Sequence, residues 1–574
     1  HFFLCFLMYC WVLADPVCGF FLKNCTIRGN LSNPSNMKVP CYNRNLEVIP
    51  IDIPRKVSNL DLAMNKISKF EKLDFKGLSN LKILNMSRNQ ISQVDDGTLG
   101  HLEALQKLGL AHTDSQPCQT ICFRTILSLL HLDNNLITTI SSSSFQPLSS
   151  LKTVNLTKNN LYNMKEVQPI VQLPHLQELY IGSNRFTSFQ SQEISNTSIG
   201  LRLLDLSQNP LGIVRITAYI LPYLEVLDIA YCGQLGHMKW DVLDRSFLRN
   251  VQRLNLSGIE MSFERMAMVL QTVSSSLVHL RLHDLVKGSR PKIKALTDVA
   301  CHIPTLSVLR LEYNNIGNLS EEFLQSCKHM TEVDISNTNL SQLSNFSFRP
   351  IEQISTLKFG HNMLSSVPDA TRNLPRLKIL DLSFNINKLG CSDFYNLTGL
   401  TKLFLFHNQI PNLPGCTLKL AGNKLSSIRK REFQSLTSLK TLLLFDNQIA
   451  SMEDGALVNL TELKLGSNKI TQIDIRNTVL TGLPLLISLD ISCNYITYVN
   501  YDKLNPPPFS HLPSLEKLRI FSQRHYQESR TLWGKGSTWN PIEFYVEPKL
   551  FYLEPKRVLQ RVLLWGQPKN PFRF

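Results

Sequence analysis

The sequence predicts an α/β solenoid, in which short repeats coil around one core with a parallel β-sheet on the concave face and irregular or short helical segments on the convex face. Two observations predict it. In LKILNMSRNQI, which begins at Leu81, the apolar residues follow neither the helical nor the simple strand period, and Asn89 lies among them. The frame L-x-x-L-x-L-x-x-N-x-L then returns, mostly every 22 to 26 residues. That period is typical of leucine-rich repeats, so the fold class is a leucine-rich-repeat horseshoe.

The asparagine of each repeat has a structural explanation. After the strand x-L-x-L-x the chain turns away from the sheet, and buried backbone groups there lose their ladder partners. An amide both donates and accepts hydrogen bonds, so asparagines stacked from turn to turn satisfy those groups. The nineteen positions of this asparagine slot are residues 65, 89, 113, 135, 159, 184, 209, 232, 259, 285, 314, 338, 362, 385, 408, 423, 447, 468 and 494.

Five slots hold another residue. Thr113, Cys232 and Thr338 keep a polar atom and can still hydrogen-bond. Ile259 and Leu285 cannot, which predicts an irregular region around these two turns.

The pattern divides the chain into four segments. Residues 1–14, HFFLCFLMYCWVLA, form an apolar run too short to span a bilayer, and we interpret them as part of a signal peptide. Residues 15–56 are the expected N-terminal cysteine cap, because a solenoid needs its ends covered. About 19 to 20 repeats occupy 57–526, and 527–574 form a non-repeat tail without an apolar run long enough for a membrane span.

One step breaks the period. Only 15 residues separate Asn408 from Asn423, which is too few to complete a turn. Either the coil is locally crushed or the sequence lacks about nine residues at this point. We favour the second interpretation.

The cysteines form three groups of disulfide candidates. One group precedes the first repeat and would close the cap, with one of its three thiols left over. Two pairs are spaced by about one turn and would be spatial neighbours, so each either forms a disulfide or remains as buried thiols. The last pair lies within one convex segment. A zinc site is not expected, because no histidine lies at the distance along the chain that is typical of zinc fingers. In this order the candidates are Cys18, Cys25 and Cys41; Cys301 with Cys327 and Cys391 with Cys416; and Cys118 with Cys122.

Glycosylation acceptors indicate the same compartment as the apolar start. Eleven Asn-X-Ser/Thr sequons favour an extracellular or endolysosomal lumen, where disulfides also form. Asn85, Asn155 and Asn255 fall between the two strand leucines, so glycans there would obstruct part of the concave face. The acceptors are Asn24, Asn30, Asn85, Asn155, Asn196, Asn255, Asn318, Asn339, Asn345, Asn396 and Asn459.

These features resemble the ectodomain of a Toll-like receptor over residues 18 to about 526. The segments LDLAMNKI, LPGC, LAGNKLSSI and FSHLPSLEKLRI are most similar to the nucleic-acid-sensing vertebrate branch that includes receptors thirteen and twenty-two. The resemblance implies a receptor that binds a microbial ligand as a homodimer or with a related Toll-like receptor. It also implies a membrane span and a cytoplasmic TIR domain, and we expect neither within these 574 residues.

Basic residues suggest where a ligand would bind. The formal charge is +15, or +11 without the tail, and a basic solenoid suits a polyanion because phosphate contacts give sequence-independent affinity. One cluster is expected on a concave strand and its neighbour, the other on a protruding loop of the longest repeat; ordinary solvated side chains are the alternative for both. The candidates are His279, Arg281, His283 and Arg310, then Lys287, Arg290, Lys292 and Lys294. Histidine would strengthen such binding in an acidified compartment.

Taken together, the sequence predicts an innate immune receptor ectodomain in the secretory pathway, with microbial RNA as the leading ligand class. The alternatives are a soluble decoy without signalling and a matrix or adhesion protein that binds other proteins. No catalytic motif such as G-x-S-x-G, H-E-x-x-H or a P-loop occurs, so neither an enzyme nor a cofactor is expected.

Overall fold

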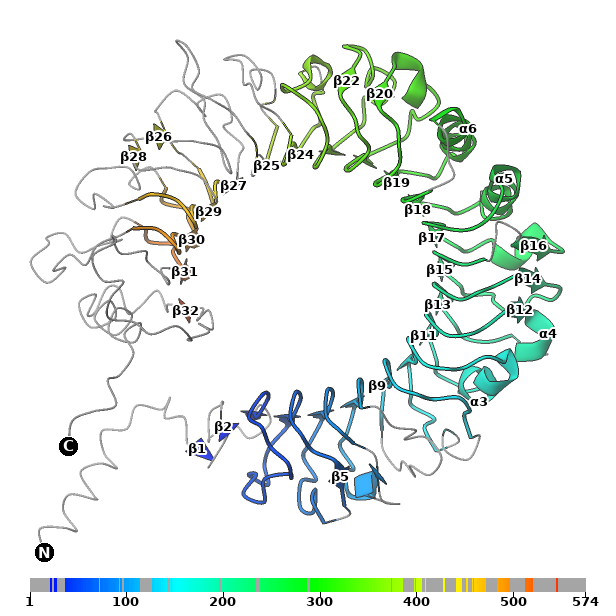
Figure 1. The fold of residues 1–574 in the computed structure, drawn as a ribbon, viewed down its shortest axis with the longest axis vertical. Coiled ribbons are helices and arrows are strands. Elements are labelled where there is room, and N and C mark those ends of the chain that lie inside the picture. The colour runs from blue at the N-terminus through cyan, green and yellow to red at the C-terminus, as the bar shows by residue number, and fades with distance from the viewer. Residues whose placement is uncertain are drawn as a thin grey trace, which may run out of the picture. The chain divides into compact units, whose positions relative to one another are not determined.

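The computed structural model forms two compact units, His1–Arg281 and Leu282–Phe574. In each unit, successive turns of the coil place a short strand on the inner side and helices or irregular segments on the outer side (Figure 1). The residues that the structure describes are 21–22, 25–27, 37–71, 73–91, 93–94, 98–113, 126–141, 145, 147–195, 198–233, 238–285, 290–372, 374–385, 397, 399–404, 408, 427–428, 440–445, 451–452, 457, 459–470, 483–495, 512–519 and 544–545.

The first unit contains a parallel sheet with one strand per turn. The central leucine or valine of each strand is buried and its two neighbours face the concave side, so Leu130, Val154 and Leu179 pair in register and lie in the core. The strands are β3 (Lys38–Pro40), β4 (Asn59–Asp61), β6 (Ile83–Asn85), β8 (Lys107–Gly109), β9 (Leu129–His131), β10 (Thr153–Asn155), β11 (Glu178–Tyr180), β13 (Leu203–Asp205), β15 (Val226–Asp228), β17 (Arg253–Asn255) and β18 (His279–Arg281).

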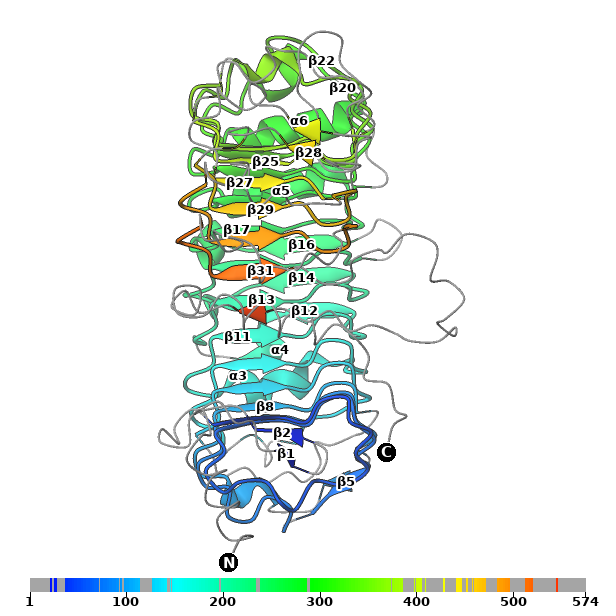
Figure 2. The same ribbon diagram turned by 90° about the vertical axis from the view of Figure 1, so that its left-hand side faces the viewer.

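The second unit repeats this arrangement. Its strands also stack as parallel rungs (Figure 2), with β32 as the antiparallel exception, because Leu518 pairs with Phe544. The strands are β19 (Val308–Arg310), β21 (Glu332–Asp334), β23 (Thr356–Lys358), β24 (Ile379–Asp381), β25 (Lys402–Phe404), β27 (Thr441–Leu443), β29 (Glu462–Lys464), β30 (Ser488–Asp490), β31 (Lys517–Arg519) and β32 (Phe544–Tyr545). The predicted parallel sheet is confirmed.

Short elements form the rest of each turn. The small sheets pair β1 (Phe21–Leu22) with β2 (Cys25–Thr26), β5 (Lys69–Phe70) with β7 (Gln93–Val94), β12 (Ser188–Gln190) with β14 (Ile213–Ile216) and β16 (Lys239–Val242), β20 (Asn318–Leu319) with β22 (Gln342–Leu343), and β26 (Ser427–Ile428) with β28 (Ser451–Met452). The helices are η2 (Thr98–His101), η3 (Met164–Val167), α3 (Gln168–Val171), α4 (Ser191–Ile194), η4 (Arg245–Leu248), α5 (Phe263–Thr272), α6 (Arg290–Cys301), η5 (Glu321–Leu324) and η6 (Asp369–Thr371).

The asparagine slot has the role that the sequence predicts. The Nδ2 of Asn159 donates to the carbonyl of Leu156 in its own turn and to that of Leu132 in the preceding turn, both at 2.9 Å. Its Oδ1 accepts a hydrogen bond from the N–H of Ile137 at 3.1 Å. Asn159 is only 6% exposed, so one buried amide satisfies backbone groups of two turns that would otherwise lack partners.

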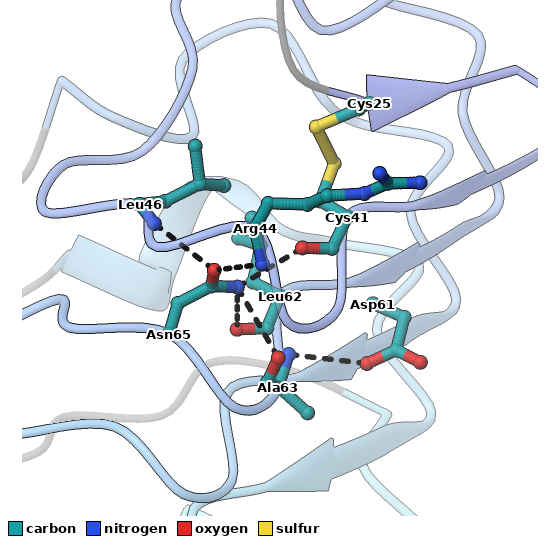
Figure 3. Close-up of a disulfide and its surroundings, with 8 residues drawn as sticks. All are labelled: Cys25, Cys41, Arg44, Leu46, Asp61, Leu62, Ala63 and Asn65. Carbon is teal, nitrogen blue, oxygen red and sulfur yellow. Dashed lines mark hydrogen bonds between the residues drawn. A yellow bond between two sulfur atoms is a disulfide. The ribbon is translucent and has the colours of Figure 1, made fainter. Parts of the chain in front are cut away.

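The same slot anchors the N-terminal cap (Figure 3). Asn65 accepts hydrogen bonds from the N–H groups of Arg44 and Leu46, and it donates to the carbonyl of Cys41 at 3.0 Å. Cys41 forms a disulfide with Cys25. The disulfide therefore closes the cap, and the Asn65 amide joins the cap to the first repeat.

The two apolar slots coincide with the irregular region that the sequence predicts. Ile259 and Leu285 are buried, and the longest helices of the described chain, α5 and α6, follow them. The N–H of Leu285 is satisfied by Asn314 of the next turn, which accepts it at 2.9 Å.

Helix α6 corrects one expectation. Residues 290–294 belong to this helix and not to a protruding loop. Pro291 is compatible with a helix start because its missing N–H would lack an intrahelical partner there. Ile293, Leu296 and Ala300 are buried, and their spacing gives the helix an inner face. Lys287 lies outside the described residues.

One of the pairs spaced by a turn forms a disulfide. Cys301 at the end of α6 is bonded to Cys327, 26 residues later, so for this pair the disulfide and not the buried thiols is the correct alternative. The remaining candidates, Cys18, Cys118, Cys122, Cys391 and Cys416, lie outside the described residues.

The short step is bypassed by the sheet. β25 pairs directly with β27, so that Leu403 lies beside Leu442 although 39 positions separate them. No described strand of the main sheet comes from the intervening turn with slot Asn423. The 15 residues between Asn408 and Asn423 are too few to complete a coil and return to the sheet, as the sequence indicates.

Candidate ligand-binding surface

The first predicted ligand contacts lie on strand β18. His279 is half-buried and Arg281 is exposed on either side of the buried Leu280, so the two side chains share the concave face. Burial raises the pKa of Asp228, and the charge of Arg281 partly opposes that increase. Arg281 thus lies within electrostatic reach of an acidic side chain. The predicted proximity of Arg281 to Arg310 would join the two units and stays a prediction.

His283 lies beside an exposed ring. Its imidazole is 6.1 Å from the Tyr313 ring, centroid to centroid, and tilted by 60° to it. Tyr313 is 62% exposed and has a left-handed φ of 59°, which a bulky residue adopts only with strain. A second ring pair, His361 on Phe384, follows on the same edge of the second unit, with centroids 3.8 Å apart.

The basic residues of α6 differ in their surroundings. Lys292 is exposed. The Nζ of Lys294 is 2.6 Å from the Oδ2 of Asp298 one helical turn later, so its charge is already paired. Arg290 is the first residue of the helix.

Arg310 is surrounded by carboxylates. Its guanidinium lies 2.7 Å from Glu332, 3.6 Å from Glu312 and 3.7 Å from Asp334. Lys358 joins the group at 3.2 Å from Glu332 and 3.4 Å from Asp334. We call these five residues the charge cluster. Three acids face two bases, so Arg310 is not an available cation for a polyanion.

Burial and repulsion perturb one member of the charge cluster. Burial and the neighbouring Asp334 charge raise the pKa of Glu312 to about 7, while Arg310 opposes the increase. Its Oε2 is buried and makes no hydrogen bond to the described residues. Glu312 therefore takes up a proton as the pH falls through about 7, and the charge cluster becomes less negative.

The concave sequons are part of the hydrogen-bonded sheet surface. The Nδ2 of Asn155 donates to Asp133 at 3.1 Å, and that of Asn255 donates to Asp228 at 2.8 Å. Their Oδ1 atoms accept from the N–H groups of Thr157 and Ser257, two residues on. A glycan on either nitrogen would have to share it with these contacts.

Other acceptors are more accessible. Asn318, Asn339, Asn345 and Asn459 are exposed, whereas Asn85 is half-buried on strand β6. The remaining four, Asn24, Asn30, Asn196 and Asn396, lie outside the described residues.

The charge cluster itself was missed in the sequence, although a signal exists. Counting back four positions from slots 314, 338 and 362 gives Arg310, Asp334 and Lys358. These alternate in sign, and the structure pairs them side by side. Aligning charges by slot would have indicated a self-compensated surface.

Comparison with known proteins defines the class. A leucine-rich-repeat family matches residues 55–114, 125–186 and 458–524, and a BspA-type leucine-rich-repeat region matches 305–416. Together they cover about half of the chain. The chain belongs to the leucine-rich-repeat proteins, and its repeats are similar to those of Toll-like receptors. Its family is non-enzymatic.

Particular relatives agree. Chicken Toll-like receptor 2 type-1 is 23% identical over 70% of this chain and 62% of its own length. Toll-like receptor 3 of Boselaphus tragocamelus is 27% identical over 55% of this chain and 36% of its own. Chicken Tsukushi is 27% identical over 39% of this chain and 68% of its own. The chain therefore spans less than two thirds of either receptor.

Solved structures agree on the fold. TLR13 in its ssRNA13 complex superposes with a TM-score of 0.69 at 24% identity, over 88% of this chain and 76% of that one. Mouse RP105 in complex with MD-1 gives 0.55 at 18% identity, over 87% and 92%. Both likenesses concern the leucine-rich-repeat fold.

Disulfides and these relatives indicate an extracellular or secretory-pathway protein. Within the described ranges, no helix has the length and apolar character required to cross a bilayer. The same residues contain no histidine, cysteine or carboxylate group of three or more that could hold a metal ion.

Proposed function

We propose that this chain is the ectodomain of an innate immune pattern-recognition receptor that binds a microbial ligand, with RNA as the favoured class. The ligand would occupy the concave face or a flank and drive dimerisation, alone or with a related Toll-like receptor, in the Toll-like receptor signalling pathway. The protein would work in the extracellular space or the endolysosomal lumen.

The observation that carries this proposal is the fold match to TLR13 along most of the chain, because that protein was solved with a single-stranded RNA. The net charge of +15 agrees with a polyanionic ligand. Repetition of one exposed strand per turn gives a long surface on which a linear ligand can make many weak contacts.

The proposed contacts are the basic residues of strand β18 and of helix α6. His279 and Arg281 lie on β18, and Lys292 is exposed on α6. Lys294 and Arg310 contribute less, because carboxylates within 4 Å compensate them.

Salt-dependent binding tests the proposal. Full-length protein is titrated into a labelled single-stranded RNA at several salt concentrations, at pH 5.5 and 7.4, with fluorescence anisotropy as the readout. Replacing Lys287, Arg290, Lys292 and Lys294 with serine should lower the slope of log K against log salt by about 0.7 for each cation in contact. An unchanged slope would reject this cluster, and absent binding would reject RNA as the ligand. Sedimentation of the same samples measures dimerisation.

A protein ligand is the second candidate. RP105, which shares the fold, was solved in complex with MD-1. A soluble decoy would bind the same ligand without signalling. RNA-independent capture of a defined protein partner, with no RNA binding, would favour the adhesion alternative.

A further inference from the structure

One concave row changes its chemistry in the middle of the second unit. The third residue of each sheet strand faces the concave side, and in most turns it is polar or charged. In chain order the row reads Arg310, Asp334, Lys358, Asp381, Phe404, Leu443, Lys464, Asp490 and Arg519. Phe404 and Leu443 are direct neighbours in the sheet. Two adjacent turns thus present apolar side chains where the others present charges.

Phe445 extends this apolar surface. It lies two residues beyond Leu443, so it shares that residue's side of the chain. Phe404 and Phe445 are both half-buried, while Leu443 is only 9% exposed. In other turns the position of Phe404 holds aspartate or lysine. A half-buried ring there adds little to the stability of the core, which favours a role on the surface.

Three lysines border these rings. Lys402 begins β25, and Lys378 and Lys440 immediately precede β24 and β27. Their backbones are linked across the sheet, because Lys402 N–H donates to the Lys378 carbonyl at 2.9 Å and Lys440 N–H to that of Thr401 at 2.9 Å. All three side chains are exposed. The lysines therefore lie on neighbouring turns, along one end of the strands that carry the rings.

These lysines have no counter-charge among the described residues. The ion pairs of the described second unit within 4 Å involve Lys294, Arg310, Lys358, Arg372, Lys464 and Arg519, and none of these three. Neighbouring strands lie about 4.8 Å apart, so the backbone positions of the three lysines extend over roughly 10 Å. A row of cations without a described counter-charge beside half-buried rings combines phosphate attraction with base stacking, the two interactions that hold single-stranded nucleic acids.

We propose that Lys378, Lys402, Lys440, Phe404 and Phe445 form a site for single-stranded RNA on the concave face. Phosphates lie along the lysines, and bases stack on the phenylalanine rings. This inference rests on the proposed function and names the site at which it operates. We call it the lysine–phenylalanine surface.

Single-stranded RNA suits this surface better than other polyanions. A duplex keeps its bases stacked inside, so it offers phosphates to the lysines but no free base to the rings. An acidic protein would meet the lysines without requiring an aromatic ring. The dependence on Phe404 therefore distinguishes the occupants.

The test uses the full chain and a labelled, unstructured RNA of about 12 nucleotides, within the usual site sizes for single strands. Binding is measured by anisotropy over a range of salt concentrations. In one variant, Lys378, Lys402 and Lys440 are changed to serine. The matched control changes Lys82, Lys107 and Lys152, which are exposed at equivalent positions of the first unit. The third residues of their strands are Asn85, Gly109 and Asn155, so no aromatic ring stands there.

The lysine variant should lower the slope of log K against log salt by about 2, since each contact with a single strand contributes roughly 0.7. The control removes the same charge and should leave the slope nearly unchanged. Equal effects of the two variants would overturn the site, because they would show attraction by net charge alone.

Phe404→Leu preserves an apolar side chain but removes the ring. It should weaken binding of the single strand about 10-fold, whereas Phe404→Tyr should restore it and duplex RNA should be indifferent to both. Equal affinity of Phe404→Leu and wild type would reject stacking. Circular dichroism melting confirms that each variant is folded.

The outcomes separate this inference from the proposed function. If wild-type protein binds RNA and neither lysines nor Phe404 matter, only the site is wrong. If wild type binds no single-stranded RNA at any salt concentration, the proposed function and the site both fail. Lysine-dependent binding of anionic vesicles or heparin, without RNA binding, would assign the surface to another anion.

Discussion

Two neighbouring parts of the same concave sheet use their cations in opposite ways. In the charge cluster, Arg310 and Lys358 lie within 4 Å of acids on adjacent turns. In the lysine–phenylalanine surface, Lys378, Lys402 and Lys440 lie beside apolar residues, and no described acid pairs with them. Strand position alone therefore does not decide whether a basic residue is available to a ligand. The residue one turn away decides it.

The difference has an electrostatic consequence. The Coulomb energy between Arg310 and a carboxylate 3 to 4 Å away greatly exceeds the energy between the same side chain and a more distant phosphate that salt screens. A polyanion approaching Arg310 would have to compete with carboxylates that are already in place. At the lysine–phenylalanine surface it competes mainly with water.

The largest expected effect on stability comes from the asparagine slot, whose hydrogen bonds hold the turns of both regions together. Asn362 donates to the carbonyls of Ile335 and Phe359 at 2.8 Å and accepts from the N–H groups of Thr338 and Leu340. Asn362→Leu would leave these buried groups unsatisfied and should lower the free energy of unfolding by about 3 kcal/mol or more. Urea unfolding measures this. A loss below 1 kcal/mol would mean that the amide does not hold the turns together.

A smaller effect should separate the two regions directly. Arg310→Ser leaves Glu312, Glu332 and Asp334 close together with only Lys358 opposing them, so we expect a loss of about 2 kcal/mol in unfolding free energy. Lys402→Ser is the control, because its side chain is exposed and unpaired among the described residues. Comparable losses from both variants would break the distinction between the regions.

The pH dependence of stability should sharpen the comparison. The pKa of Glu312 is raised to about 7, so its favourable contribution is present when it is protonated and is lost as the pH rises through 7. Wild type should lose up to roughly 2 kcal/mol between pH 5 and 8 through this group. Glu312→Gln should remove that part of the pH dependence and be the more stable form at pH 8. Parallel pH profiles for the two proteins would contradict the assignment.

The smallest effect is expected at the lysines themselves. Lys402→Ser should change unfolding free energy by less than about 0.5 kcal/mol, as for most exposed positions. A large destabilisation would show that the lysine has a structural partner and would weaken its assignment to a ligand.

Much of the fold could be predicted because the position of a residue within its own repeat determines its burial and its hydrogen bonds. Asn89 and Asn159 could be assigned to buried hydrogen bonds from their place in the frame alone. The Cys301–Cys327 pair followed from its spacing of about one turn, since turns are spatial neighbours. Ile259 and Leu285 predicted an irregular region because their apolar side chains cannot make the hydrogen bonds of the slot. The structure has its long helices there.

The candidate site was less predictable, because it depends on register and not on local pattern. Arg310 looked available in the sequence, while two of its three acidic partners, Glu332 and Asp334, come from the next turn. Residues 290–294 looked like a loop, but the buried face of α6 was hidden by an unusually long repeat. Phe404 and Leu443 become neighbours only because the sheet bypasses the short step that follows Asn408.

Ultraviolet cross-linking of bound single-stranded RNA, followed by mass spectrometry of the digested protein, tests the central claim most directly. The lysine–phenylalanine surface predicts cross-links to peptides that contain Phe404 and Phe445, lost when excess unlabelled RNA competes. Cross-links confined to the peptides of the charge cluster, around Arg310 and Lys358, would contradict the account.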